Sequence, residues 1–233
     1  MAMHISVIIP TLDEERTITT TLEHTSSLGF DELIVVDGGS LDQNPVLVES
    51  YRRKTQSPLR LATAPCGRAR QMNEGAKTSS GEVLLFLHAD TQLPDDAKTM
   101  IEAALADQQM VGGRFDVRFD HPSMWGTIVS RMMNWRSRLS GIATGDQALF
   151  VRRDIFVQIG GFADMPLMED IDFSRRLKRK GATAALTATV STSFRRWERH
   201  GPLRTILLMW ALRFLYWIGV RSHTLSRWYG LIR

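Results

Sequence analysis

Three short apolar runs in the first half of the chain constrain its fold most, because each is followed by acidic residues. The runs lie in HISVIIPTLDEE (4–15), ELIVVDGGS (32–40) and EVLLFLHADT (82–91). Their apolar residues are continuous, which is typical of strands in a parallel sheet covered on both faces. Right-handed crossovers bring the carboxyl ends of such strands to one edge, where ligands of open α/β sheets bind. We therefore expect the acids to converge on one cleft.

Helical segments alternate with these strands. Helices are predicted at 13–29, 41–54, 67–81 and 94–108, and a further strand at 59–64. Thr11 or Asp13 is placed to cap the first helix, and Gly29 to end it. The second half predicts a strand at 111–120, a helix at 124–139, a strand and a helix within 145–162, and a helix at 168–181. This order predicts an α/β fold with a mainly parallel central sheet, helices on both faces and a C-terminal helical tail.

The composition is that of an ordinary globular protein. The chain has 233 residues, of which 43% are hydrophobic and 23% charged, so we expect one sizeable domain with a short appendage. Its single cysteine, Cys66, cannot form an intramolecular disulfide, and the first residues lack a basic, apolar, cleavable leader pattern. A cytoplasmic protein is therefore expected.

Positive charge is concentrated toward the C-terminal end. From Ile171 onward the chain has thirteen Lys and Arg residues against two acids, although its net charge is only +4. Such an end favours phosphate groups, an acidic lipid surface or nucleic acid as partners. Nucleic acid ranks last, because the chain has no aromatic and basic sheet motif and no recognition helix.

The apolar stretch TILLMWALRFLYWIGV (205–220) lies in this basic end and carries Arg213 near its centre. It falls short of the roughly twenty apolar residues that cross a bilayer. Its basic flanks and its Trp and Tyr residues are compatible with peripheral membrane contact through 203–220, at the inner face of the membrane. We favour the alternative, a helix that packs on the rest of the chain or on the second subunit of a homodimer.

Seven motifs carry a resemblance to a known family. In chain order they are VIIPTLDEE, VVDGGS, GRARQMNEGA, LFLHADT, GDQALFVRR, MEDIDFSRRLKRKG and SFRRW, between residues 7 and 197. Together they resemble the family-2 glycosyltransferases, which have the GT-A fold. GRARQMN, GDQALFVRR and RRWERHG are similar to a small subgroup associated with arsenosugar biosynthesis. We expect a GT-A domain at 1–199, with a nucleotide-binding half at about 1–110 and an acceptor half at about 111–199, and a helical tail at 200–233.

The resemblance implies an inverting transferase that moves a sugar from a nucleotide-diphospho-sugar donor to a small hydroxyl acceptor. Mg²⁺ or Mn²⁺ is the expected cofactor, because hard oxygen ligands and a diphosphate suit these cations. In the family, an Asp-x-Asp at a strand end supplies the metal and donor contacts. Here His88 stands in place of the first acid, and Asp90 matches the second and is expected to bind the cation. His88 would be a second ligand, contact ribose or phosphate, or be satisfied by the backbone alone.

The other expected donor contacts come from the remaining strand ends and from the helix at 67–81. By resemblance, Glu14 contacts the ribose and Asp37 the base or ribose, since ribose hydroxyls are hydrogen-bond donors. The alternative for Glu14 is a charge that complements a helix dipole. Arg68 and Arg70 lie in the first turn of their helix, where they meet a phosphate or are simply exposed. The predicted donor site comprises Pro10, Thr11, Glu14, Asp37, Arg68, Arg70, His88 and Ala89.

The expected catalytic residue lies in PLMEDIDFSRRL. Inversion requires a carboxylate opposite the leaving group that takes the proton of the acceptor hydroxyl. The resemblance assigns this role to Asp170, and it places Glu169 and Asp146 on the acceptor side. The alternative for the pair at 169 and 170 is a helix N-terminus, where acids are also favoured.

SFRRW (193–197) matches the family's QxxRW motif, with Ser193 in the place of Gln. By resemblance, Arg196 would clamp the diphosphate and Trp197 would stack against the acceptor. Because the Gln is replaced, a single transfer to a small acceptor is expected rather than processive polymer synthesis.

Two other functions stay open. The apolar tail is compatible with transfer to a polyprenyl phosphate at the membrane surface. The substitution of His88 for an acid is compatible with a catalytically silent protein that binds sugar nucleotides.

Overall fold

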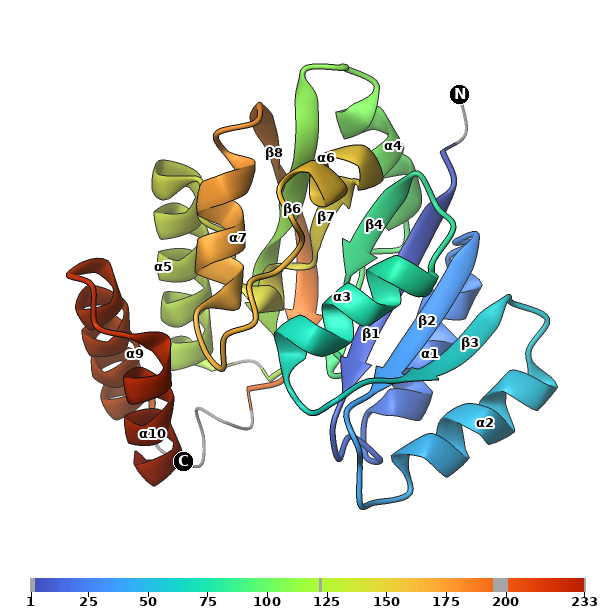
Figure 1. The fold of residues 1–233 in the computed structure, drawn as a ribbon, viewed down its shortest axis with the longest axis horizontal. Helices are drawn as coiled ribbons and strands as arrows, with labels where there is room; N and C mark the ends of the chain where they lie inside the picture. Colours follow the sequence, from blue (N-terminus) through green and yellow to red (C-terminus); the bar gives the residue numbers. More distant parts are fainter. Residues whose placement is uncertain (1–2, 122, 195–200, 233) are drawn as a thin grey trace.

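The computed structural model describes residues 3–121, 123–194 and 201–232. The strands of these residues form one eight-stranded sheet in the order β3-β2-β1-β4-β7-β6-β8-β5 (Figure 1). The strands are β1 (Ile5–Thr11), β2 (Glu32–Asp37), β3 (Leu59–Thr63), β4 (Val83–Phe86), β5 (Thr91–Gln92), β6 (Met110–Phe119), β7 (Leu149–Arg152) and β8 (Ala182–Thr192).

The sheet is mixed but mostly parallel. The four strands β3, β2, β1 and β4 run parallel to one another, and β6 runs parallel to β8. Strand β7 is antiparallel to both β4 and β6, and β5 is antiparallel to β8. In the parallel part, Thr11 at the end of β1 pairs with Asp37 at the end of β2. The expectation of a mainly parallel sheet with clustered strand ends is confirmed.

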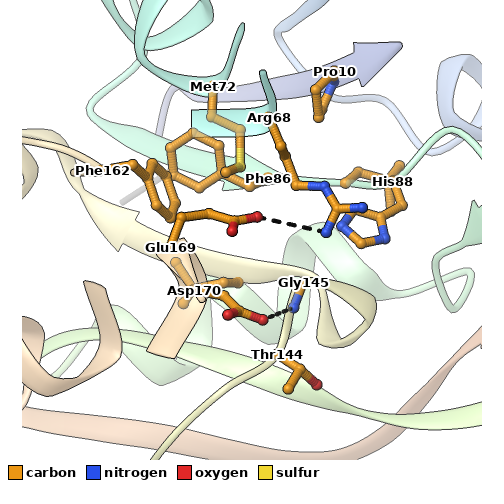
Figure 2. Close-up of a pocket in the computed structure, with 12 residues that line it drawn as sticks. Pro10, Arg68, Met72, Phe86, His88, Thr144, Gly145, Phe162, Glu169 and Asp170 are labelled. Carbon is orange, nitrogen blue, oxygen red and sulfur yellow. Dashed lines mark hydrogen bonds and ion pairs between the residues drawn. The ribbon is translucent and has the colours of Figure 1, made fainter. Parts of the chain in front are cut away.

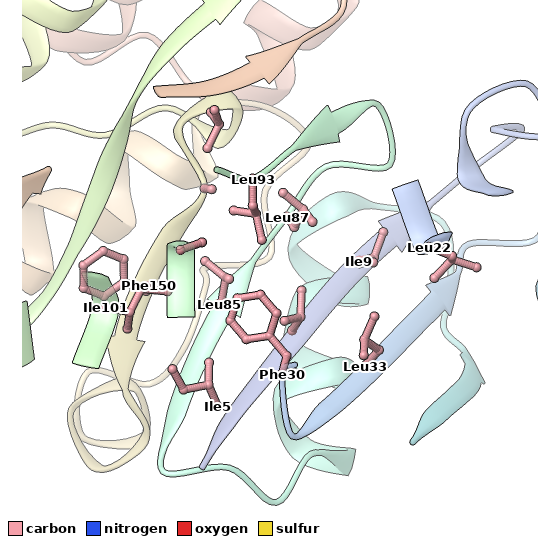
Figure 3. Packing of buried hydrophobic residues seen from close by; sticks show 14 of the residues in the cluster. Ile5, Ile9, Leu22, Phe30, Leu33, Leu85, Leu87, Leu93, Ile101 and Phe150 are labelled. Atoms are coloured by element: carbon pink, nitrogen blue, oxygen red, sulfur yellow. The ribbon is translucent and has the colours of Figure 1, made fainter. Parts of the chain in front are cut away.

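Helices cover both faces of the sheet, as the continuous apolar strands predict. One face packs against α1, α2 and α4, where Leu22 and Ile101 belong to the same buried cluster as Ile9 and Leu85 (Figure 3). The other face packs against α3, α6 and α7. The helices are α1 (Ile18–Ser27), α2 (Asn44–Lys54), α3 (Arg68–Thr78), α4 (Ala97–Leu105), α5 (Met124–Ser140), α6 (Arg153–Gln158), α7 (Glu169–Leu177), α9 (Pro202–Trp217), α10 (Ser222–Ile232) and the short 3-10 helix η1 (Gly145–Gln147).

The prediction of the first helix cap is wrong. Helix α1 begins at Ile18, because Asp13 adopts a left-handed φ of 55° and its carboxylate accepts the N–H of Leu41 at 2.8 Å. Thr11 is the last residue of β1. Gly29 follows the end of the helix with a φ of 69°, as expected. The side chains at this strand end therefore join two loops and do not cap the helix.

Strand β8 is a further difference, since no strand was predicted at 182–192. Its sequence, ATAALTATVST, consists of small and β-branched residues without a continuous apolar run. It is a strand because it pairs with β6 along nearly its whole length and with β5 at its end.

The C-terminal segment forms two helices, α9 and α10, that lie beside α5 and α7 (Figure 1). Leu212 of α9 and Leu225 of α10 pack against Met168 and Ile171 at the start of α7. Within the described ranges, no helix has the length and apolar character needed to span a membrane. The outer face of α9 exposes large apolar side chains, namely Leu203, Leu207, Trp210, Phe214 and Trp217.

Candidate active site

A pocket opens at the carboxyl ends of β1 and β4, beside the start of α7 (Figure 2). Five of the residues predicted from the sequence line it, although they come from four separate segments. They are Pro10, Arg68, His88, Glu169 and Asp170. The predictions did not include the other lining residues, which are Met72, Phe86, Leu87, Thr144, Gly145, Leu149 and Phe162.

Glu169 and Arg68 face each other across this pocket. The Nη1 atom of Arg68 lies 3.6 Å from Oε1 of Glu169, whose side chain is buried (Figure 2). Burial raises the pKa of Glu169, because the charge on Arg68 only partly offsets the loss of water around the carboxylate. The pKa of Arg68 is also raised, since desolvation, which lowers it, is outweighed by the charges of Glu169, Asp146 and Asp170.

Asp170 is fixed at the first turn of α7 by two backbone donors. Its Oδ2 atom accepts the N–H of Gly145 at 3.0 Å, and its Oδ1 atom accepts the N–H of Ile171 at 2.7 Å. Met168, two residues before Asp170, has a left-handed φ of 71°, which turns the chain into the helix. Asp170 therefore lies at a helix N-terminus, as the alternative interpretation of its sequence position predicts. It also borders the pocket. Its remaining lone pairs can accept a hydroxyl proton.

His88 contacts Asp146 of η1. Its Nδ1 atom lies 3.1 Å from Oδ1 of Asp146, and its Nε2 atom is buried without a hydrogen-bond partner in the described part of the chain. The imidazole lies against Gly145, since a Cβ added there would collide with the ring. This orientation offers no open ring nitrogen to a cation, so the role of His88 as a metal ligand stays a prediction that requires the ring to turn.

Asp37 is held by a dense set of hydrogen bonds at the end of β2. Its carboxylate accepts the N–H groups of Gly39 and Ser40 at 2.9 Å, the hydroxyl of Ser40 at 2.5 Å and the amide of Asn44 at 3.0 Å. Burial by itself raises the pKa of Asp37, but these hydrogen bonds outweigh it and the pKa is lowered. Its contact with a nucleoside stays a prediction.

Gln71 of α3 lies beside Asp37 and was missed from the sequence. Its Nε2 atom donates to the carbonyls of Thr11 at 2.6 Å and Val36 at 3.0 Å, and so joins the ends of β1 and β2. A Cβ at Gly38 would lie 2.9 Å from this nitrogen, so Gln71 fills the space that a side chain at 38 would need. The sequence feature that could have identified Gln71 is its position as a polar residue on the face of α3 that also buries Met72 and Gly75.

Asp90 lies in the turn after β4, next to Ala89. It is half-buried, and its carboxylate makes no hydrogen bond or ion pair with any residue in the described ranges. Those ranges contain no group of three His, Cys, Asp or Glu residues that could hold a metal by themselves. Mg²⁺ and Mn²⁺ commonly bind through one or two carboxylates together with substrate phosphates. The single carboxylate of Asp90 therefore fits a cation that a diphosphate also coordinates.

Other predicted residues lie away from the pocket lining. Arg70 forms an ion pair with Asp164 at 2.8 Å on the surface. Glu14 accepts the hydroxyl of Thr17 at 2.9 Å, and the carbonyl of Ala89 accepts the hydroxyl of Thr21 at 2.7 Å. Their nucleotide contacts stay predictions. Arg196 and Trp197 lie outside the described residues.

Two glycosyltransferases resemble this chain in sequence, one over less than half of it and one over about three quarters. It is 34% identical over 107 residues to the poly(ribitol-phosphate) beta-N-acetylglucosaminyltransferase TarS of Staphylococcus aureus, a match that covers 44% of this chain and 18% of TarS. It is 27% identical over 201 residues to the probable glycosyltransferase YdaM of Bacillus subtilis, which covers 76% of this chain and 47% of YdaM. The chain thus spans less than half the length of either relative.

Solved structures show the same fold. TarS residues 1–349 in complex with UDP-GlcNAc align with a TM-score of 0.65 at 20% identity, over 82% of this chain and 58% of that one. The mannosyltransferase PcManGT from Pyrobaculum calidifontis in complex with GDP-Man and Mn²⁺ aligns with a TM-score of 0.67 at 19% identity, over 83% and 57%. The sequence model of glycosyl transferase family 2 matches residues 6–163. This chain, with its GT-A fold, therefore belongs to glycosyl transferase family 2.

Proposed function

We propose that this chain is an inverting, metal-assisted glycosyltransferase that moves a sugar from a nucleotide-diphospho-sugar to a hydroxyl group of a small acceptor. One observation carries the proposal: Glu169 and Asp170 border the same pocket as Pro10, near the end of β1, and His88, just after β4. This is the edge at which open α/β sheets bind their ligands. A carboxylate for the acceptor and the strand ends for the donor thus belong to one site.

The relatives support the donor class. The TarS structure contains UDP-GlcNAc, and the PcManGT structure contains GDP-Man together with Mn²⁺. In this chain, Asp90 would hold the cation, which neutralises charge on the departing diphosphate. Arg68 lies at the N-terminal turn of α3 and can add positive charge next to that group.

The proposed reaction is a direct displacement at the anomeric carbon. The acceptor oxygen forms the new bond to that carbon while the bond to the diphosphate oxygen breaks, and its electron pair leaves with the nucleoside diphosphate. Asp170 takes the proton of the acceptor hydroxyl. The N–H groups of Gly145 and Ile171 hold the carboxylate in position throughout. The configuration at carbon is inverted because attack and departure occur on opposite faces.

A second candidate is transfer to a polyprenyl phosphate at the membrane surface. It is favoured by the exposed apolar side chains of α9, which include Trp210, Phe214 and Trp217. A catalytically silent protein that binds sugar nucleotides is a further alternative. It is compatible with the contact between His88 and Asp146, because the imidazole then has no role in the proposed reaction. The arsenosugar subgroup, a cytoplasmic location and the boundary between a domain at 1–199 and the tail are further parts of the proposal.

A thermal-shift screen of nucleoside diphosphates and their sugars, with and without Mn²⁺, tests the donor class. A ligand that binds the folded state raises the melting temperature in proportion to the logarithm of its concentration over Kd. We expect one nucleotide-sugar to stabilise the protein, and more so with Mn²⁺. Product formation from that donor with an acceptor library then separates the enzyme from the silent binder. If no nucleotide-sugar binds at millimolar concentration, the proposed function is wrong.

A further inference from the structure

Two arginines beside Asp170 have hydrogen-bond donors without partners. Arg136 lies on α5 and Arg213 on α9. The Nε and Nη2 atoms of Arg136 and the Nε atom of Arg213 are buried, and no hydrogen-bond partner for them exists in the described part of the chain. Arg68, in contrast, is paired with Glu169. Buried donors of a charged group without partners cost free energy, so their presence requires an explanation.

The two guanidinium groups are close enough for their charges to interact. Burial, together with the charge of Arg213, lowers the pKa of Arg136 to about 10, while the charge of Asp170 partly offsets this. Burial also lowers the pKa of Arg213, and the charges of Asp170 and Asp146 oppose that shift. Guanidinium groups in proteins keep their proton at neutral pH. Two positive charges with unused N–H groups thus lie near enough to Asp170 to interact with its charge, and neither arginine lines the pocket.

The packing of α9 fixes Arg213 in this place. Met209 and Tyr216, one helical turn before and after it, belong to the apolar cluster formed with Ile171 of α7. The guanidinium of Arg175 lies 5.4 Å from the centre of the Tyr216 ring, which is a second contact between the two helices. Arg213, the one charged residue in the apolar stretch 205–220, therefore lies on the face of α9 that packs against α7.

We propose that Arg136 and Arg213 bind a phosphate group of the acceptor and so place the acceptor hydroxyl next to Asp170. This inference rests on the proposed transferase function and names its acceptor class. A phosphate monoester carries a charge of about −1.5 to −2 at neutral pH, which matches two guanidinium groups better than a single carboxylate does. The planar fork of N–H donors in Arg also suits phosphate oxygens. Asp170 is common to the donor pocket and to the arginine pair, as a base between donor and acceptor must be.

The phosphate could come from a soluble molecule or from a lipid. The two helices that carry these arginines also expose large apolar side chains, namely Trp135 and Leu139 on α5, and Trp210 and Phe214 on α9. A soluble phosphate monoester would use the arginines alone, whereas a lipid phosphate would also contact these side chains. The experiment below has one arm for each source.

The test uses the full chain with Mn²⁺ and a saturating amount of the nucleoside diphosphate that the thermal-shift screen selects, so that the donor pocket is filled. The soluble arm titrates inorganic phosphate by calorimetry at constant ionic strength. The lipid arm measures sedimentation with vesicles of phosphatidylcholine that contain phosphatidic acid, and with phosphatidylcholine vesicles alone. The variants are Arg136→Gln and Arg213→Gln. Arg131→Gln on α5 and Arg204→Gln on α9, both at exposed positions, are the matched controls.

We expect each arginine variant to bind phosphate at least tenfold more weakly than the wild type in one arm, while both controls bind as the wild type does. Binding in the soluble arm assigns a soluble acceptor, and binding only to the vesicles with phosphatidic acid assigns a lipid acceptor. Equal binding by variants and controls in both arms, or no binding by the wild type in either, overturns the proposal.

Two further measurements separate this proposal from others. Arg213→Met removes a charge with an unpartnered buried nitrogen, so the melting temperature should stay the same or rise while phosphate binding is lost. A lower melting temperature would show a structural role and overturn the inference. Donor binding, measured without phosphate, should be equal in all variants. If the wild type binds no donor, the proposed function fails independently of the phosphate result.

Discussion

The Nδ1 atom of His88 lies 3.1 Å from Oδ1 of Asp146. The same imidazole lies against the backbone of Gly145 and leaves no room for a side chain at position 145. This contact joins the turn after β4 to the short helix η1, two segments that are far apart in the sequence. Gly145 also donates to Asp170. The position of His88 is thus coupled to that of the proposed base through a single glycine.

Replacing Gly145 by Ala should therefore destabilise the protein through His88. The added Cβ would collide with the imidazole, and overpacking of this kind costs about 1–3 kcal/mol. Urea unfolding of Gly145→Ala, His88→Ala and the double variant measures the effect. We expect the two losses to be clearly less than additive, because His88→Ala removes the colliding ring. Additive losses would show that Gly145 is required for another reason.

The proposed base is tested by Asp170→Asn. Removing a general base lowers the turnover rate by about 10²- to 10⁴-fold. Donor affinity should change little, because in the proposed reaction Asp170 contacts the acceptor. Asp172→Asn is the matched control, since Asp172 lies on the same helix and pairs with Arg176. Steady-state kinetics and calorimetry with the preferred donor give both quantities, and undiminished turnover in Asp170→Asn would rule out the base role.

Asp90→Ala should abolish the effect of the cation on nucleotide binding. In the wild type we expect tighter nucleoside diphosphate binding with Mn²⁺ than without it, because the proposed cation would be shared by Asp90 and the diphosphate. In the variant, the two affinities should be about equal. Asp95→Ala, an exposed acid between β5 and α4, is the control and should keep the effect of Mn²⁺. A variant that still responds to Mn²⁺ would place the metal elsewhere.

Asp37 should make stability depend on pH at acidic values. Its pKa in the folded state is lowered from the ordinary value of 3.8, so folding favours the ionised form. This contribution is present above the unfolded-state pKa and is lost as the pH falls through the folded-state pKa. Asp37→Asn should cost about 1–3 kcal/mol at neutral pH, because its amide meets backbone donors.

Urea unfolding at several pH values between neutral and strongly acidic checks this expectation. The difference in free energy of unfolding between wild type and Asp37→Asn should shrink below pH 3.8 as Asp37 becomes protonated. Asp96→Asn, an exposed acid at the start of α4 without a capping hydrogen bond, is the control. A constant difference at all pH values would contradict the stabilising role of the ionised form.

The local sequence was sufficient to predict most helices and strands. The predictions failed where contacts between distant segments determine the conformation. The apolar runs ending at Thr11, Asp37 and Phe86 are parallel strands whose ends meet, as their patterns predict. Strand β8 lacks such a run and forms because β6 offers a pairing edge. Asp13 looked like a helix cap, but its hydrogen bond to Leu41, in another loop, stabilises a different conformation.

The sequence by itself determined the α/β fold and the residues at the strand ends, because hydrophobic periodicity and turn signals act over a few neighbouring positions. Only the tertiary structure decided that Gln71 occupies the space next to Gly38 and that His88 lies against Gly145. It also decided that Arg136 and Arg213 come near enough to Asp170 for their charges to interact. These relationships depend on which helix faces pack together. That packing is settled by the whole core and leaves no periodic signal at the residues themselves.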